Sequence, residues 1–451
     1  MSTPQDLQPT RWKEQEKIIF RFIFIYFLLQ AVPLDWIYYA NISHINWAKL
    51  HYTDIFYISR YTPQFVSGKH ITGVWGIGTI ADWALIATIA LAGTLVWSLR
   101  DKNRNNYSTL YQWLRIIVRY RLAIGIIGYG FIKFFPMQAP FPSISNLNTS
   151  YGNYTDWKIF SMSLGIAPNY ESFLGAVEII AGLLLLFRKT ATIGALIIVV
   201  FTGNVFMSNL AYEGGEHLYS IYLVTFALFI LSFDAVRIYR LVSLEQPTEA
   251  NKFKLHFTTR QNTARLALKS LVIFFFVFLY GFKTYSGFLH DPYQFPHQSG
   301  IAKASGLYNV SEFRINHQVL PYSPIDSVRW KDVVFEKWAT ISIRSNRRVI
   351  IDSVNYEELN EKDKDRNYES SGTAERQYYS YTADTLNHTL LLENKNKHYK
   401  GDQLKFNYSR PDSTTMVLSG INQHRDSIYV VLNKIDKKYP IELGRRKALK
   451  L

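Results

Sequence analysis

Cysteine is absent from all 451 residues of the chain. Its absence excludes disulfides, thiol redox chemistry and cysteine-ligated iron–sulfur clusters. No apolar run contains a pair of histidines, and HExxH, P-loop and GxSxG motifs are missing, so neither a bis-histidine haem nor these catalytic classes is indicated. His44, His51 and His70 are too scattered to predict a metal site. We therefore expect no haem, iron–sulfur, thiol or metal centre.

Long apolar runs are missing from residues 290–451 but dominate the chain before them. The mean hydropathy of −0.05, although 48% of residues are hydrophobic, indicates that an apolar part and a polar part average out. Seven runs of roughly 18 to 23 residues can each cross a hydrocarbon core of about 30 Å as a helix. These runs are 18–39, 77–99, 114–135, 170–187, 190–210, 217–236 and 266–288. The sequence predicts about seven transmembrane helices in a helical domain of residues 18–288.

The net charge of +15 is unevenly placed. Basic residues gather in the segments 11–21, 100–115, 188–189 and 237–269, which flank alternate ends of the apolar runs. The first connection on the opposite side also carries basic residues, Arg60 among them, and weakens this contrast. The alternation is nevertheless typical of membrane topology.

The positive-inside rule places residues 1–17 in the cytoplasm. After an odd number of crossings, the C-terminal region then lies outside. Because most of the basic residues mark cytoplasmic connections and juxtamembrane segments, the positive charge does not indicate nucleic-acid binding. The expected partner of this part of the chain is the lipid bilayer.

The C-terminal region differs in composition from the helical domain. Residues 289–326 are rich in proline and glycine and are expected to form an extended linker. Residues 327–451 contain short runs with strand character, which favour an antiparallel, all-β sandwich. The expected strands are 332–336, 340–343, 349–351, 378–382, 389–392, 404–408, 415–418 and 428–432.

Three polar groups fall inside consecutive apolar runs at similar depth. A helix rises 1.5 Å per residue, so Lys133 lies roughly 18 to 21 Å above Arg121 and Arg119, the basic anchors of its own helix at the cytoplasmic surface. Glu178 lies roughly 15 Å, and Asn204 roughly 22 Å, above the same side of the membrane. Because buried charges in a membrane cost about 2.5 to 3.5 kcal/mol each on insertion scales, they normally find a partner.

We expect an ion pair between Lys133 and Glu178, with Asn204 as a hydrogen-bonding neighbour. Two interpretations of this polar layer stay open. It is either structural, as an ion-pair clamp or as a lysine near Pro136 that reaches towards the membrane surface, or a polar pocket in which Lys133 and Glu178 are the candidate catalytic, proton-transferring residues.

More polar side chains flank this layer and extend the candidate ligand-binding site. Tyr129 precedes Lys133 by one turn, and Gln138 follows the same run. Asn209 and Tyr212 lie in the connection NLAYEGGEH, between the fifth and sixth runs. Tyrosines at this depth are also common interface anchors, so the cluster indicates a site more strongly than any single member does.

Residues 120–240 resemble the DoxX-like family of bacterial inner-membrane proteins. The resemblance lies in the segments RLAIGIIGYGFIKFFPMQAPFP, LGIAPNYESFLGAVEIIAGLLLLFRKTATIGALI and NVFMSNLAYEGGEHLYSIYLVTFALFILSFD. It implies a four-helix bundle over about 114–240, an inner-membrane location with a periplasmic C-terminal domain, and a link to quinone-dependent oxidoreductases. The extra helices and the exported β domain are similar to the vitamin K carboxylase-like group, but no local motif transfers that group's catalytic residues.

Three functional hypotheses from different classes follow. The chain is a quinone- or lipid-binding component of a membrane redox complex, in which a protein partner completes electron flow. Alternatively, it is an envelope assembly or scaffold subunit that binds a partner in the membrane or periplasm through its β domain. In the third hypothesis it is a carboxylase-like or lipid-modifying membrane enzyme. The sequence leaves open whether the chain is an enzyme.

Overall fold

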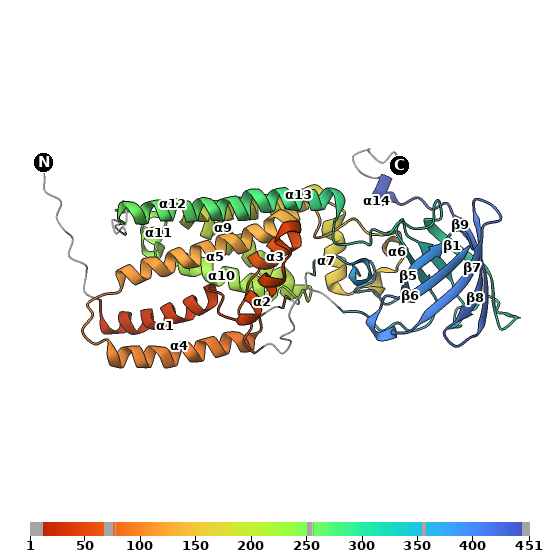
Figure 1. The fold of residues 1–451 in the computed structure, drawn as a ribbon, viewed down its shortest axis with the longest axis horizontal. Helices are drawn as coiled ribbons and strands as arrows, with labels where there is room; N and C mark the ends of the chain where they lie inside the picture. The colour runs from red at the N-terminus through yellow and green to blue at the C-terminus, as the bar shows by residue number, and fades with distance from the viewer. Residues whose placement is uncertain are drawn as a thin grey trace. The chain divides into compact units, whose positions relative to one another are not determined.

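The computed structural model describes residues 12–66, 75–76, 78–249, 255, 257–353 and 358–443. The chain folds into two compact units, one helical and one built around a β-sheet (Figure 1). The helical unit comprises Met1–Phe135, Ser172–Ala211 and Glu216–Gly287. The second unit comprises Pro136–Glu171, Tyr212–Gly215 and Phe288–Leu451, so three separate stretches of chain build it.

The helical unit is built around the long helix α5, Ser108–Phe134, which packs against α1, α3 and α10. Its other helices are α1 Glu14–Ala31, α2 Trp36–His44, α3 Tyr52–Ser59, α4 Ile80–Arg100, α8 Pro168–Leu185, α9 Ala191–Ala211, α10 His217–Ser232, α11 Ala235–Val242, α12 Thr259–Ile273 and α13 Tyr280–His290, with the short turn η1 Trp47–Lys49. A π-helical stretch, Phe274–Leu279, joins α12 and α13 into one continuous helix.

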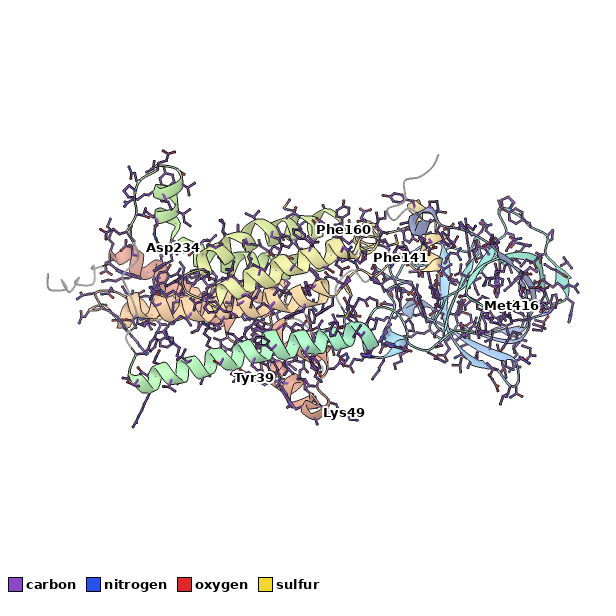
Figure 2. The ribbon with its side chains drawn as sticks, turned by 90° about the horizontal axis from the view of Figure 1, so that it is seen from above. Tyr39, Lys49, Phe141, Phe160, Asp234 and Met416 are labelled. Atoms are coloured by element: carbon purple, nitrogen blue, oxygen red, sulfur yellow. The ribbon has the colours of Figure 1, made fainter. Side chains whose placement is uncertain are left out.

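The expectation of about seven transmembrane helices is wrong. Four helical segments in the described part of the chain are long and apolar enough to cross a membrane: Glu14–His44, Ile80–Arg100, Ala191–Ala211 and Thr259–His290. A fifth crossing is present if α10 and α11 count as one span, although the two helices bend by 72°. Asp234 lies at this bend (Figure 2), where Arg115 pairs with it at 3.1 Å.

The two remaining expected spans do form helices, α5 and α8, but charged and polar residues interrupt their apolar character. The first half of α5 contains Arg115, Arg119 and Arg121. The first turn of α8 is polar, and Glu178 lies at its middle. Both helices use part of their surface to bury polar groups inside the unit, and this lowers the mean hydropathy by which a crossing helix is recognised.

The β-sheet of the second unit closes into a barrel, which corrects the predicted sandwich. Nine antiparallel strands follow one another, and pairing between β1 and β9 closes a ring of eight; β2 pairs only with β1. The strands are β1 Gly306–Ile315, β2 Gln318–Val319, β3 Asp332–Phe335, β4 Thr340–Arg344, β5 Arg376–Asp384, β6 Thr389–Asn394, β7 Gln403–Ser409, β8 Thr415–Asn422 and β9 Ser427–Ile435. Part of the segment expected as a linker, 289–326, therefore forms β1 and β2.

Apolar side chains fill the barrel interior. Along β7, Leu404, Phe406 and Tyr408 are buried and alternate with exposed residues, as a strand with one face towards a core requires. Met416, labelled in Figure 2, is fully buried in the same core. An eight-stranded barrel is just wide enough for side chains to fill, and this one is filled rather than hollow.

Residues from Pro136–Glu171 cover part of the outer face of the barrel. They form α6 Ile144–Leu147, η2 Tyr151–Asn153 and α7 Asp156–Gly165. The backbone N–H of Ser145 donates to Glu336 Oε1 at 2.7 Å, and its hydroxyl contacts that of Ser342 at 2.7 Å. The amide of Asn146 donates to the carbonyl of Glu369 at 3.0 Å. A polar network therefore fixes this early segment to strands that follow it by almost two hundred residues.

A lysine is buried in this unit, and no carboxylate among the described residues lies at salt-bridge distance from it. Lys158 on α7 is 2% exposed, donates to the carbonyl of Tyr368 and lies 3.8 Å from the centroid of that ring. Glu369, whose charge acts on Lys158, is paired with Lys395 at 2.6 Å. Burial lowers the pKa of Lys158 to about 7, and the attraction of Glu369 opposes this only in part.

We expect Lys158 to make the barrel unit more stable as the pH rises from 7 towards 10.5, its ordinary pKa. In this window the unfolded chain binds a proton that the folded chain does not, so stability rises by up to about 1.4 kcal/mol per pH unit. Denaturant unfolding at several pH values should show a flatter dependence in Lys158→Met. The exposed Lys405 on β7 supplies the control, Lys405→Met, and an unchanged slope in Lys158→Met would contradict this assignment.

Candidate functional site

Glycines bring helices α5 and α8 into close contact. A Cβ atom on Gly175 would lie 2.2 Å from the backbone nitrogen of Phe134 and 2.5 Å from the carbonyl oxygen of Gly130. A Cβ on Gly130 would in turn lie 2.8 Å from the side chain of Ile179. Small residues at such positions let helix backbones approach directly. Side chains within one turn of this crossing therefore meet.

Lys133 and Glu178 lie beside the crossing and form a buried ion pair. The Nζ atom of Lys133 is 2.5 Å from Oε1 of Glu178, and the side chains are 11% and 3% exposed. The second carboxylate oxygen of Glu178 is buried and has no hydrogen-bond partner in the described part of the chain. The ion pair expected from the sequence is present, and one carboxylate oxygen of Glu178 accepts no hydrogen bond from the described residues.

The pair continues into a second buried ion pair through a tyrosine. Lys133 lies 5.8 Å from the ring centroid of Tyr129, whose hydroxyl donates to Glu216 Oε2 at 2.7 Å. The other oxygen of Glu216 accepts from Arg60, the residue that ends α3. We call these five residues, Lys133, Glu178, Tyr129, Glu216 and Arg60, the charge network. They join α3, α5, α8 and the start of α10.

Arg121 and two tyrosines extend the charge network along α5 and α10. Arg121 Nη2 donates to the carbonyl of Ser59 at 2.9 Å and to that of Tyr61. Its Nε donates to the hydroxyl of Tyr222 at 3.4 Å. Tyr219 packs on Tyr129 with ring centroids 5.1 Å apart, and its buried hydroxyl has no partner among the described residues. This part of the unit thus gathers groups that bind or exchange protons.

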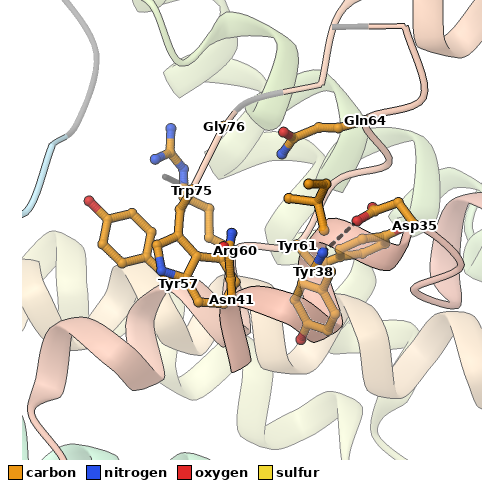
Figure 3. A pocket seen from close by; sticks show the side chains of 10 residues that line it. Asp35, Tyr38, Asn41, Tyr57, Arg60, Tyr61, Gln64, Trp75 and Gly76 are labelled. Carbon is orange, nitrogen blue, oxygen red and sulfur yellow. Dashed lines mark hydrogen bonds between the residues drawn. The ribbon is translucent and has the colours of Figure 1, made fainter. Parts of the chain in front are cut away.

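A pocket opens onto the charge network at Arg60 (Figure 3). We call it the Arg60 pocket. It lies among α2, α3 and the chain that follows them, and its lining is aromatic and polar: Asp35, Ile37, Tyr38, Asn41, Tyr57, Arg60, Tyr61, Gln64, Trp75 and Gly76. The rings of Tyr57 and Trp75 stack with an interplanar angle of 3°. Asp35 caps α2 by accepting from the backbone N–H of Tyr38 at 2.8 Å, which holds this wall in place.

The two asparagines predicted to lie in the site differ in burial. The side chain of Asn204 is exposed on α9, so it is not the expected buried neighbour of Lys133. Asn209, on the same helix, is buried, and its amide donates to the backbone carbonyl of Val205 at 2.9 Å. Its side-chain oxygen has no partner in the described chain.

Gln138 and Tyr212 belong to the second unit. The backbone N–H of Gln138 donates to Glu171 Oε1 at 2.9 Å, which anchors the chain as it enters that unit. The ring of Tyr212 stacks on Phe160 with centroids 4.7 Å apart, and the residue is 40% exposed. Neither contact involves the charge network.

Sequence reasoning missed three functional candidates. The sequence predicts a loop charge at Arg60 and an anchor at the membrane surface at Arg121, yet both residues are buried. Glu216 was placed in an outer connection, although it joins the two halves of the charge network. The spacing of Arg121 provided a signal, because it lies on the same face of α5 as Gly125 and Gly128, where other helices pack.

Comparison with known proteins finds no relative: no protein-family model, curated protein or solved structure matches the chain. Among the described residues, no group of three or more His, Asp and Glu side chains is arranged to hold a metal ion.

Proposed function

We propose that this chain is a membrane protein that binds the head group of a quinone in the Arg60 pocket, as a component of a membrane redox complex. The observation that carries the proposal is the position of Arg60. This residue lines the pocket and is also the last residue of the charge network, where it pairs with Glu216. A ligand in the pocket would therefore contact a chain of groups that leads to a buried lysine and carboxylate.

The pocket has the chemistry that a quinone ring requires. Stacked Tyr57 and Trp75 offer a flat aromatic surface, and such ring pairs contribute about 0.5 to 1.5 kcal/mol beyond area burial. The side chains of Asn41, Arg60 and Gln64 carry N–H donors suited to the carbonyl oxygens of the ring. Aromatic rings combined with polar groups that fix the orientation of a ligand are typical of cofactor recognition.

The charge network contributes groups that can gain or lose protons. Reduction of a quinone to a quinol takes up two electrons and two protons. Tyr129 donates to Glu216 and Lys133 donates to Glu178, so each half of the charge network contains a hydrogen bond along which a proton can move. Lys133 contacts Tyr129 over its ring, 5.8 Å from the centroid, and this contact is not a hydrogen bond. In this proposal a partner oxidoreductase supplies the two electrons, and the chain, which has no cysteine, contributes no cysteine-ligated iron–sulfur centre. The DoxX-like resemblance supports the same assignment.

A binding titration tests this proposal. The full chain in detergent is titrated with a short-chain quinone while tryptophan fluorescence is recorded. We expect Trp75→Leu to weaken binding about tenfold, because it removes the stacking surface and its buried area. Native mass spectrometry with solvent extraction should also find a quinone bound to protein purified gently from its own membrane.

Trp36→Leu serves as the matched control, since Trp36 begins α2 but is 64% exposed and does not line the pocket. It should leave the affinity unchanged. Equal affinity in wild type and Trp75→Leu, or a wild type that binds no quinone, would refute the proposal.

One observation favours a second function, a carboxylase-like or lipid-modifying enzyme. The unpartnered oxygen of Glu178 beside Lys133 is an arrangement in which a proton can pass to or from a substrate. Under this alternative, Glu178→Gln abolishes a change in membrane lipid composition that the wild type causes, while the protein stays folded. Identical lipid profiles from the two strains by mass spectrometry would exclude it.

A further inference from the structure

Basic side chains from three parts of the helical unit meet at one of its ends. Arg119 lies on α5, Arg188 in the turn between α8 and α9, and Arg265 and Lys269 on α12. The positive charge of Arg188 acts on Arg119, and the charges of Arg119 and Arg265 act on Lys269. We call these four residues the basic cluster. The fold gathers them, because three separate stretches of the chain supply them.

Like charges dominate this end of the unit. No carboxylate among the described residues acts on Arg119 or Lys269. Asp234, at the bend between α10 and α11, is already paired with Arg115 at 3.1 Å, and its other oxygen lies 4.0 Å from Arg237. Because neighbouring positive charges repel one another, an anion that binds among them stabilises the folded chain.

Aromatic neighbours hold Arg119 and Lys269 in position. The Nζ atom of Lys269 lies 3.6 Å from the ring centroid of Phe187, in the turn after α8. Tyr120 forms a side-chain hydrogen bond with Arg119, whose Nε atom is buried, so water screens this charge incompletely. Phe187 and Tyr120 carry no charge. They position the two cations without balancing them.

The basic cluster lies at the level where an apolar helix would leave a membrane. Arg265 and Lys269 shortly precede the apolar stretch Leu271–Leu279, within the segment Thr259–His290 that is long and apolar enough to cross a membrane. Helix α11 lies at the same end of the helical unit as the start of α12 (Figure 1). It bends by 72° from α10 and exposes both apolar and basic side chains. Amphipathic helices of this kind lie in the membrane surface, at the depth of the lipid head groups.

Exposed apolar side chains flank the basic cluster. Phe187 is 51%, Leu268 64% and Leu271 61% exposed. A free phosphate ion would leave these side chains uncovered, whereas the acyl chains of a lipid would pack on them. Arginine and lysine are the side chains that most often bind phosphate, arginine through two parallel hydrogen bonds. We propose that the basic cluster binds the phosphate group of an anionic phospholipid.

Native mass spectrometry of the full chain in detergent, titrated with phosphatidylglycerol or phosphatidylcholine, tests this proposal. Both lipids carry a phosphate, but the ammonium group of choline would lie among the cations of the cluster. We expect phosphatidylglycerol to bind at least tenfold more tightly. Arg119→Gln/Lys269→Gln should weaken phosphatidylglycerol binding about tenfold. Arg100→Gln/Lys102→Gln removes two exposed cations at the end of α4, and as the charge-matched control it should bind phosphatidylglycerol as the wild type does.

The variant Arg119→Gln/Lys269→Gln should fold, because it removes mutually repelling charges. Thermal unfolding provides a second readout: phosphatidylglycerol should raise the unfolding temperature of the wild type but not of this variant. Equal binding of the two lipids by the wild type would overturn the proposal, as would equal losses of affinity in the two double variants. Displacement of the lipid by equimolar inorganic phosphate would overturn the assignment to a lipid. The proposal does not rest on the quinone site, and the Trp75→Leu titration tests that site separately.

Discussion

Glu178→Ala is expected to destabilise the helical unit by about 3 to 5 kcal/mol, because it leaves the ammonium group of Lys133 buried without its counter-charge. Both side chains are almost completely shielded, so solvent cannot replace the lost partner. Thermal unfolding in detergent, followed by circular dichroism, measures the loss. The chain should still insert into a membrane, because the helices that are long and apolar enough to cross one are unchanged.

The double variant Lys133→Met/Glu178→Leu distinguishes the loss of the ion pair from the cost of leaving one buried charge unpaired. Replacing both charges by apolar groups of similar size removes the uncompensated charge, and buried pairs replaced in this way are often neutral in stability. We therefore expect the double variant to recover most of the loss seen in Glu178→Ala. Additive losses from the two single changes would show that no coupling exists between Lys133 and Glu178.

Gly175→Ala is expected to lower the stability of the same unit by about 1 to 3 kcal/mol, the usual cost of inserting volume into a packed contact. The new Cβ would lie 2.2 Å from the backbone nitrogen of Phe134, and backbone cannot move aside as a flexible side chain can. Helices α5 and α8 must separate. The Lys133 and Glu178 side chains would then be drawn apart.

Gly203→Ala provides the control for this change. Gly203 also lies in a helix, α9, but a Cβ at this position would meet nothing within 4 Å. Here only the helix propensity of alanine acts, which favours the helix by about 1 kcal/mol. Opposite signs for the two glycines are expected in thermal unfolding. Equal shifts would mean that the close contact of α5 and α8 contributes nothing.

The ion pair was predictable because the rise of a helix is fixed. Counting residues from the basic anchors gives a depth, and Lys133 and Glu178 have similar depths. Depth says nothing about which way a side chain points around its helix axis. Asn204 shows the consequence: it has a suitable depth but is exposed on α9. Interhelical packing decides direction, and that packing depends on residues distant in sequence.

The second half of the charge network was not predictable in this way, since Arg60 and Glu216 lie at helix ends. A charge at a helix end normally reaches water, so nothing in the local sequence distinguishes a buried one from a solvated one. Their burial follows from the fold, in which α3 packs against α5.

For the β domain, most strands were predictable but their closure was not. Alternating burial makes β7 recognisable from its own residues. A sandwich and a barrel share such strands and differ only in which pair joins last. Closure here depends on β1, Gly306–Ile315, which lies in a segment whose prolines and glycines predicted a linker. The register of β1 against β9 involves residues more than one hundred positions apart.

In the barrel unit, residues that are synthesised early form hydrogen bonds with residues that are synthesised much later. Ser145 leaves the ribosome long before Glu336, its hydrogen-bond partner 191 residues later. During translation the stretch Pro136–Glu171 must therefore wait, with Lys158 and its polar neighbours uncovered, until Phe288–Leu451 has been made. Contacts of such large sequence separation form slowly. A chain truncated at residue 290 would keep Pro136–Glu171 but lack the residues that this stretch packs against. The phenotype of such a truncation would therefore combine the loss of the barrel with the misfolding of the remaining chain.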